Sequence, residues 1–300
     1  MEGTELRIEH RPKLDRPVMI CAFRGWNDGG QGASLAGSFL SRTWKADRFA
    51  EIDPELFFDF QMTRPHVALV DGERRIEWPE NSFQTARVAT ASASTPKDAV
   101  LLLGTEPSLR WRAFAAIVSG LASELDVSMV VTLGSLLADV PHTRPAPVTA
   151  SATDAGMLEE LGLQPSLYEG PTGMVGVLHD ACRVANIPSV SLWAAVPHYV
   201  QLTPSPRAAM ALCDRLATLI DVEIDTSELD DASDAYVQQV SEAVAADEET
   251  AAYVDELESR AEEIEVDEDT ELPSGETLAA ELTRFLRERE QSDDDGPSAQ

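Results

Sequence analysis

Apolar and polar positions along the first two thirds of the chain form blocks that predict strands and helices in turn. The run PVMICAF at residues 17–23 is apolar throughout, which is typical of a strand buried on both faces of a parallel sheet. Small and apolar residues then recur at helical spacing at Ala33, Ala36, Gly37 and Leu40. The pattern predicts a strand, a glycine-rich turn and a helix, in that order.

The same alternation repeats further along the chain. Further strands are predicted at AVLLLG (99–104), SMVVTLGS (128–135) and PSVSLWAAV (188–196). Helices are predicted between and after them, at 111–125, 154–162, 170–187 and 204–220. The last of these begins with Ser205 as N-cap and Pro206 at its first position. This order predicts an α/β fold with a three-layer, mainly parallel sheet.

The segment DGERRIEW at 71–78 interrupts this alternation. It carries an Asp-Gly turn signal between short runs of strand-like residues. We therefore predict a small β-hairpin at the edge of the fold.

The chain changes character near residue 221. Tyr236, Val240 and Val244 are spaced four apart, and further helical stripes follow within 254–264 and 278–286. We predict an α/β core at 1–222, an acidic helical appendage at 223–290 and a disordered tail at 291–300. The appendage either packs on its own core or forms an arm that reaches a neighbouring subunit or a basic partner.

Charge is concentrated in that C-terminal region. The formal net charge is −30, and residues 221–300 hold 28 of the 53 acidic residues but only 4 of the 23 basic ones. Such a charge repels the phosphate backbone and anionic lipid headgroups, so binding to nucleic acid or to a membrane surface is not expected. A partner steered by electrostatics would be basic.

Cysteine usage and hydropathy indicate the compartment. Cys21, Cys182 and Cys213 are isolated and form no CxxC pair, so buried thiols in a reducing compartment are expected. The sequence lacks an apolar run long enough to span a bilayer. We expect a cytoplasmic protein.

Polar residues that follow the predicted parallel strands are the candidates for a ligand pocket. Ligands of open α/β sheets bind at the carboxyl ends of the strands, where the βα loops gather. A second glycine turn, GPTGM at 170–174, opens a predicted helix. The candidate pocket residues are Asn27, Asp28, Gly29, Gly30, His142, Arg144, Thr172, His198 and Tyr199.

The loop FRGWNDGGQGAS at 23–34 resembles a phosphate-binding loop only superficially. It lacks the GK[ST] ending of a Walker motif, and its glycines do not give GxGxxG. Backbone N–H groups of Gly29, Gly30 and Gln31 at a helix start would hold an anion. The favoured alternative is a tight turn in which glycine supplies positive φ and close packing. Trp26 is expected to pack or to anchor an interface rather than to bind substrate.

The loop PHTRP at 141–145 holds two polar side chains between prolines. Prolines fix an extended backbone, so His142 and Arg144 either act together as general acid and anion-binding group or make structural hydrogen bonds. The sequence contains neither GxSxG nor HExxH. We predict no catalytic residue, no metal and no cofactor.

Four segments together resemble one family. These are ICAFRGWNDGGQGAS, LADVPHTRPAPV, YEGPTGMVGVLHDACRVANIPSVSLWAAVPHYV and ELPSGETLAAELTRFLRE, and they occur in the family's order. They resemble the PAC2 family, named after proteasome assembly chaperone 2, and in particular its branch typical of actinobacteria. The resemblance covers about residues 5–290.

The resemblance carries expectations about fold and function. It implies an architecture similar to that of purine nucleoside phosphorylase and peptidyl hydrolases, and homo-oligomers, with a trimer favoured. Eukaryotic relatives escort proteasome α-subunits without catalysis, partly through a C-terminal tail ending in a hydrophobic-Tyr-X motif. This chain ends in GPSAQ, so docking by such a tail is not expected.

Two functions are therefore carried forward. The first is a non-enzymatic, homo-oligomeric protein with a protein-binding or assembly-chaperone role linked to the proteasome. The alternative is an enzyme or small-molecule sensor, similar to nucleoside phosphorylases or peptide hydrolases, that uses a pocket at the strand ends.

Overall fold

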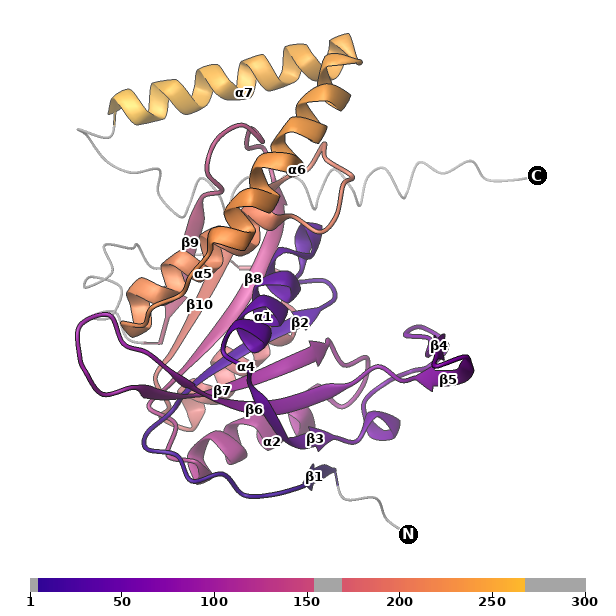
Figure 1. The fold of residues 1–300 in the computed structure, drawn as a ribbon, viewed down its shortest axis with the longest axis vertical. Coiled ribbons are helices and arrows are strands. Elements are labelled where there is room, and N and C mark those ends of the chain that lie inside the picture. Colours follow the sequence, from indigo (N-terminus) through magenta and orange to yellow (C-terminus); the bar gives the residue numbers. More distant parts are fainter. Residues whose placement is uncertain (1–4, 154–168, 268–300) are drawn as a thin grey trace.

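A computed structural model of the chain describes residues 5–153 and 169–267. Its centre is an eight-stranded sheet in the order β1-β3-β6-β7-β2-β8-β10-β9, with helices on both faces (Figure 1). The strands are β1 (Leu6–Ile8), β2 (Val18–Arg24), β3 (Asp47–Ile52), β6 (Asn81–Val88), β7 (Lys97–Thr105), β8 (Met129–Ala138), β9 (Val148–Ala152) and β10 (Ser189–Pro197).

Two helices cover each face of this sheet. The first pair, α1 (Gly32–Thr43) and α5 (Pro206–Ile220), packs on one face, and α2 (Trp111–Glu124) and α4 (Met174–Val184) pack on the other. Two short 3₁₀ helices also occur, η1 (Gly29–Gln31) and η2 (Pro54–Leu56). The β2 strand is buried from Val18 to Phe23 and contributes alternate residues to both cores. The uninterrupted apolar run thus reflects burial on both faces.

The predicted α/β architecture is confirmed. Strands β7, β2, β8 and β10 pair in parallel at the centre of the sheet. The sequence did not predict β1, β3, β6 and β9, which add antiparallel pairs toward the two edges. These strands are short or mix charged with apolar residues, as in DRFAEI at 47–52, so the strand signal along each of them is weak.

Two local sequence signals, the N-cap of one helix and the turn of the hairpin, are also confirmed. The hydroxyl of Ser205 accepts a hydrogen bond from Ala208 N at 3.3 Å and caps α5, and Pro206 is the first helical residue. The hairpin prediction corresponds to β4 (His66–Val70) and β5 (Glu73–Glu77). Its turn residues Asp71 and Gly72 both have positive φ, as a two-residue hairpin turn requires.

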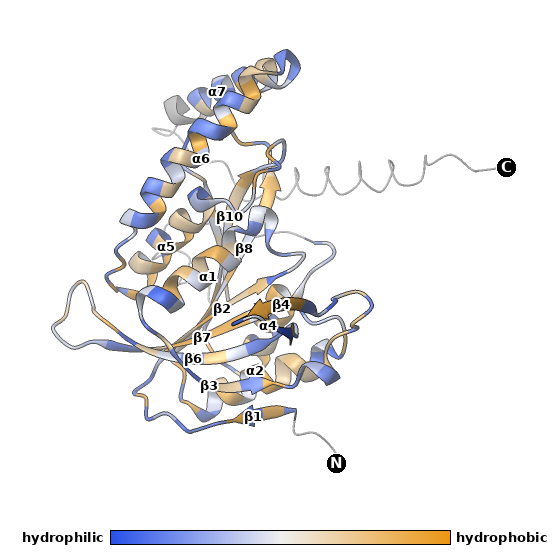
Figure 2. Ribbon diagram, turned by 45° about the vertical axis from the view of Figure 1, so that its right-hand side comes forward, coloured by the Kyte–Doolittle hydropathy of each residue, from blue (hydrophilic) through white to orange (hydrophobic). Residues whose placement is uncertain are grey.

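The acidic region begins with two long helices, α6 (Ser227–Ala245) and α7 (Glu248–Asp267). The α6 helix packs on α5, and α7 follows it across the end of the sheet (Figures 1 and 2). Leu229, Tyr236 and Val240 of α6 are buried, as are Val254 and Leu257 of α7. These helices therefore pack on the core, while the helix predicted at 154–162, the stripe at 278–286 and the tail at 291–300 lie outside the described residues.

Two further observations concern the buried thiols and membrane insertion. All three cysteines are unpaired and buried. Within the part of the chain that the structure describes, no helix combines the length and the apolar character needed to cross a membrane.

Candidate functional site

Five of the nine candidate residues belong to two groups of contacting residues at the carboxyl ends of the parallel strands. We call the first the Glu106 cluster: Trp26, Asn27, Glu106, Gly173 and Met174. We call the second the helix-docking cluster: Asp139, His142, Arg144, His198 and Tyr199, together with Ser241, Tyr253 and Glu258 of α6 and α7.

In the Glu106 cluster, one carboxylate joins the loop after β2 to the start of α4. Glu106 Oε1 accepts hydrogen bonds from Asn27 Nδ2 at 3.0 Å and from Met174 N at 2.7 Å. Glu106 Oε2 accepts one from Trp26 N at 3.2 Å. A negative charge at a helix N-terminus is favourable, because it meets unpaired N–H groups and the positive end of the helix dipole. Glu106 thus caps α4 from another segment of the chain.

Close packing explains the glycine in front of α4. A Cβ on Gly173 would lie 2.0 Å from Asn27 Nδ2 and 2.6 Å from Glu106 Oε1. Glycine is therefore required for Asn27 and Glu106 to approach the helix. The neighbouring candidate Thr172 is exposed and lies beside Gly176, one turn into α4. Asn27 is buried, and its Oδ1 has no hydrogen-bond partner.

Asp28 holds the start of α1. Its Oδ1 accepts hydrogen bonds from Ser34 N at 3.0 Å and from the Ser135 hydroxyl at 3.5 Å. The Ser135 hydroxyl in turn accepts one from Ala33 N at 3.3 Å. Burial raises the pKa of Asp28, and these hydrogen bonds oppose the rise. The side chain thus joins β8 to the first turn of α1.

The glycines of the same loop lie against neighbouring elements. A Cβ on Gly29 would lie 3.0 Å from the Leu136 backbone, and one on Gly30 would lie 2.8 Å from Val196 Cγ1. Gly30 also has a φ of +57°. The loop is therefore a tight turn packed on β8 and β10. Trp26 is 52% exposed, and its backbone N–H is held by Glu106, so it is not packed in the core and its role as an interface anchor stays a prediction.

In the helix-docking cluster, His142 connects two loops to α6. His142 Nδ1 lies 2.9 Å from the Tyr199 hydroxyl, and His142 Nε2 lies 3.0 Å from the Ser241 hydroxyl. The Tyr199 hydroxyl also accepts a hydrogen bond from His142 N at 2.8 Å. Burial lowers the pKa of His142 and raises that of Tyr199 to about 12. Neutral rings therefore hold these loops against the helix.

Arg144 makes the corresponding connection to α7. Its Nε donates to Glu258 Oε2 at 2.7 Å, and its guanidinium also pairs with Glu262. Arg207 of α5 donates from Nε to the Arg144 carbonyl at 2.6 Å and from Nη2 to the Thr143 carbonyl at 3.0 Å. The PHTRP loop is thus held from α5 and α7 together.

His198 and Tyr199 belong to an aromatic group that includes Tyr253 of α7. The three rings contact one another edge to face, with centroids 5.5 to 6.0 Å apart. Tyr253 donates to Asp139 Oδ1 at 3.0 Å. His198 Nδ1 lies 3.1 Å from the same oxygen. The carboxyl ends of β8 and β10 are therefore packed against α7.

The candidates are thus brought to one edge of the sheet but not into one group. Asn27 lies at the start of α4, and Asp28 bonds to the first turn of α1. The C-terminal helices are instead contacted by the loops that carry His142, Arg144, His198 and Tyr199. The strand-end rule brings Glu106, which follows the strand at 99–104, to this edge as well, but no sequence signal placed it among the pocket candidates. Nothing local could indicate Ser241, Tyr253 or Glu258, because they lie on helices distant in sequence. The choice of pocket residues stays a prediction.

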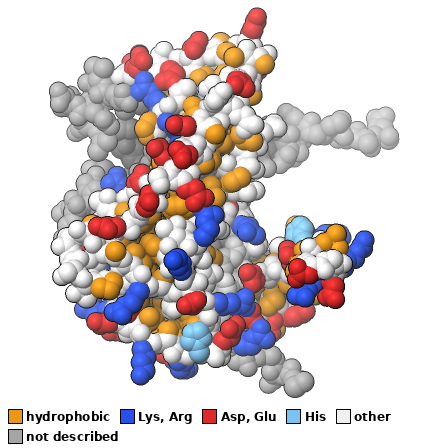
Figure 3. Space-filling model, viewed as in Figure 1, with side chains coloured by type: hydrophobic (Ala, Val, Ile, Leu, Met, Phe, Trp, Pro, Cys, Tyr) orange, Lys and Arg blue, Asp and Glu red, His pale blue; other side chains and the backbone are white. Residues whose placement is uncertain are grey.

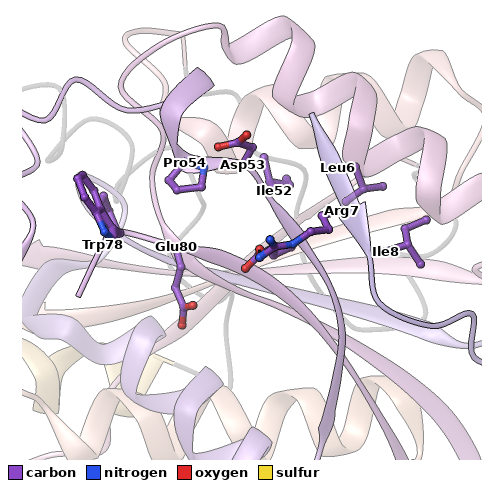
Figure 4. Close-up of a pocket in the computed structure, with 10 residues that line it drawn as sticks. Leu6, Arg7, Ile8, Ile52, Asp53, Pro54, Trp78 and Glu80 are labelled. Atoms are coloured by element: carbon purple, nitrogen blue, oxygen red, sulfur yellow. The ribbon is translucent and has the colours of Figure 1, made fainter. Parts of the chain in front are cut away.

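A cavity occurs elsewhere on the protein. It has a volume of about 730 Å³ and lies between β1, the end of β3 and the segment after the β4–β5 hairpin (Figure 4). Its lining combines Trp78 and prolines with charged side chains such as Arg7 and Glu80. None of the candidate residues lines it.

The order of these elements agrees with a known family. A family model described as the PAC2 family matches residues 22–244. The chain belongs to the PAC2 family. That match includes the parallel strands β7, β8 and β10, the end of β2, both clusters' loops and most of α6.

Solved structures of other proteins have the same fold. A PAC2 family protein from Streptomyces avermitilis is 47% identical, with 79% of this chain and 99% of that chain covered and a TM-score of 0.74. A proteasome-assembly chaperone homologue from Mycobacterium tuberculosis is 42% identical, with the same coverage and a TM-score of 0.71. PbaB of Pyrococcus furiosus, an archaeal proteasome activator, is 18% identical with a TM-score of 0.63, covers 81% of this chain and 99% of its own, and shares the fold. No curated protein matches the chain significantly.

Proposed function

We propose that this PAC2 protein is a non-enzymatic, homo-oligomeric factor that binds proteasome subunits and assists their assembly. The observation that supports the role most directly is the 42% identity to a proteasome-assembly chaperone homologue over nearly the whole of that protein. We take the active state to be a trimer and the compartment to be the cytoplasm. Three unpaired, buried cysteines agree with a reducing compartment.

The contacts at the strand ends support a binding role over a catalytic one. In this class of fold, the crevice at the carboxyl ends is where ligands bind. Here the loops after β8 and β10 use His142, Arg144 and Tyr199 to hold α6 and α7. Their hydrogen-bonding groups therefore stabilise the position of two acidic helices.

The acidic helices are the surface that we propose for the client. The apolar stripes of α6 and α7 face inward, and their exposed faces carry many carboxylates, including Asp231, Glu249 and Asp255. Complementary charge raises association rates, and the effect weakens with salt. A basic surface of a proteasome subunit would be attracted to this face.

Co-expression with the proteasome α- and β-subunits of the same organism tests the proposal. Native mass spectrometry should show a complex of this chain with free or partly assembled subunits, and mature particles should lack it. A deletion strain should accumulate unassembled subunits. Absence of any retained subunit, together with normal assembly in the deletion strain, would contradict the chaperone role.

Charge variants locate the binding face. Neutralising Asp231, Glu249 and Asp255 together should slow association with the captured subunit about tenfold at low salt, because charge steering is lost. The effect should diminish at high salt.

A matched control changes the same amount of charge on the core. Neutralising the exposed Asp47, Glu55 and Asp126 removes three carboxylates away from α6, α7 and the β4–β5 hairpin. This variant should associate at nearly the rate of the unmodified chain. Equal slowing in both variants would show that net charge matters and that the helical face does not.

A second candidate function, small-molecule sensing, is favoured by one feature of the Glu106 cluster. Asn27 Oδ1 is buried without a partner next to a carboxylate and the start of α4. A buried polar atom without a partner costs free energy that a bound donor group would recover. A thermal-shift screen with nucleosides, phosphate, ATP and peptides tests this, and an Asn27→Leu variant should abolish any shift observed.

A further inference from the structure

The β4–β5 hairpin is separate from the main sheet. It forms its own two-stranded sheet and projects from the body of the protein (Figures 1 and 3). A two-stranded hairpin in water is marginally stable, and three or more strands or a packing partner are needed for independent stability. The hairpin therefore lacks, within the described part of the chain, the partner that its architecture calls for.

One face of the hairpin is apolar and exposed. Val67 and Leu69 lie on the same face of β4, and Ile76 of β5 is paired with Val67. Their exposed fractions are 60%, 74% and 53%. Exposed apolar groups that adjoin in this way mark interaction sites, whereas single ones are ordinary.

The two edges of the hairpin differ in charge. The sequence of β4, HVALV, contains no Lys, Arg, Asp or Glu, whereas β5, ERRIE, contains four such residues (Figure 2). Edge strands are commonly protected from pairing by charged residues or proline. Only the β5 edge is protected in this way, so β4 is the edge available for pairing.

The turn fixes which backbone groups of β4 point outward. In a hairpin closed by two residues, the flanking pair is hydrogen-bonded, and hydrogen-bonded and non-hydrogen-bonded pairs then alternate. The flanking pair here is Val70 with Glu73. Val67 and Leu69 therefore direct their N–H and C=O groups away from β5.

We propose that β4 pairs with β4 of a second copy of this chain, antiparallel, about a two-fold axis through Ala68. In that register Val67 of each copy lies opposite Leu69 of the other. Both residues have outward backbone groups, so each pair exchanges two hydrogen bonds. A register shifted by one residue would place outward groups opposite inward ones. The apolar residues of both copies then form one continuous face.

The register favours a second copy as the occupant, because the outward groups of Val67 and Leu69 pair with the same groups of an identical strand about the two-fold axis. Net charge opposes the association but does not act at this edge. Two chains with a net charge of −30 repel each other over most of their surfaces. Along β4 they meet no like charges, and the flanking β5 strand carries two arginines and two glutamates. An isologous contact of this kind closes at two copies and leaves no open edge for further growth on that side.

The inference rests on the proposed self-association and specifies a surface for it. A two-fold contact requires an even number of protomers. Together with the proposed trimer, it gives a hexamer in which hairpins join two trimers.

The mass of the full chain in solution tests the pairing, measured by light scattering and native mass spectrometry. Leu69→Lys places a charge on the shared face, and Val67→Pro removes an outward N–H while keeping the bonds between β4 and β5. Each variant should halve the mass. Glu73→Lys on the other edge is the matched control and should leave the mass unchanged.

A disulfide measures the register directly. The two Ala68 residues would form a non-hydrogen-bonded pair with Cα atoms about 4.5 Å apart, within the range that a disulfide spans. Ala68→Cys should therefore give a covalent dimer on mild oxidation. Arg75→Cys, on the same face of β5, should give none. Because the native cysteines are buried, they do not contribute.

The outcomes separate this inference from the proposed function. A trimer whose mass is unaffected by Leu69→Lys and Val67→Pro would overturn the pairing and leave self-association intact. A monomeric chain would overturn both. An assembly that is halved by these variants, and that captures no proteasome subunit, would support the pairing and contradict the chaperone role.

Discussion

Arg144 Nε lies 2.7 Å from Glu258 Oε2, which joins the loop after β8 to helix α7 across more than a hundred residues of sequence. Both side chains are about three quarters buried, with exposed fractions of 22% and 27%. Ion pairs at such sites are screened less by water and salt than exposed ones. This pair is one of the polar contacts that join the PHTRP loop to the acidic helices, together with that between His142 and Ser241.

A double-mutant cycle of Arg144→Met and Glu258→Gln should give a coupling free energy of about 1 kcal/mol or more. The reason is the partial burial of both partners. The measurement is urea unfolding of the four proteins. The control cycle uses Arg260 and Glu256, an i,i+4 pair on the exposed surface of α7, and should give about 0.3–0.5 kcal/mol. Equal couplings would show that α7 is not held by Arg144.

Glu106→Ala should lower the free energy of unfolding by about 2–3 kcal/mol. It removes a carboxylate that accepts three hydrogen bonds, one of them from the first residue of α4. Glu106→Gln should cost less, because an amide oxygen can still accept from Met174 N. Hydrogen exchange at the first turn of α4 should increase in the alanine variant. Unchanged exchange there would contradict the capping role.

The pH dependence of stability should include a contribution from His142. Burial lowers its pKa in the folded protein, so below the ordinary histidine value the unfolded chain binds more protons than the folded one. Stability from this group is therefore present above that value and is lost as the pH falls.

Comparison of urea unfolding at about pH 7.5 and 5.5, which bracket the ordinary value of about 6.5, tests this. His142→Asn should lose less stability between these two conditions than the unmodified chain. Burial also lowers the pKa of His179, so His142→Asn with His179→Asn should flatten the dependence further. The raised pKa of Asp28 makes its contribution to stability increase as the pH falls. Because Asp28 is present in all the proteins compared, this contribution cancels. The prediction would be contradicted if His142→Asn lost as much free energy of unfolding between the two pH values as the unmodified chain.

Gly30→Ala should destabilise the protein by about 1–3 kcal/mol. Its φ of +57° disfavours a side chain, and the new Cβ would lie 2.8 Å from Val196. Gly120→Ala is the opposite case, since this exposed glycine lies inside α2 with no heavy atom near its Cβ position. Alanine there should stabilise by about 0.5–1 kcal/mol, measured by thermal and urea unfolding. If alanine destabilised the protein at both positions, the loss at Gly30 could not be attributed to the backbone conformation of its turn.

The sequence was sufficient for the parallel strands of the core and for individual helix and turn signals. The unbroken apolar run at 17–23 indicated a central strand because burial on both faces leaves no place for polar residues. Ser205 and Pro206 marked a helix start because an N-cap and a first-turn proline act through neighbouring backbone atoms. The Asp-Gly turn predicted the hairpin for the same reason, and the concentration of acidic residues after 221 was evident from composition.

Only the tertiary structure decided which polar side chains contact one another. The strand-end rule placed Asn27 and His142 at the same edge of the sheet, but it could not show that one joins Glu106 and the other joins Ser241. Those partners are separated by many residues, and their contacts follow from how α4 and α6 pack rather than from any local signal. The exposure of the β4 edge is also a tertiary property, because alternation in sequence does not reveal whether another strand lies alongside.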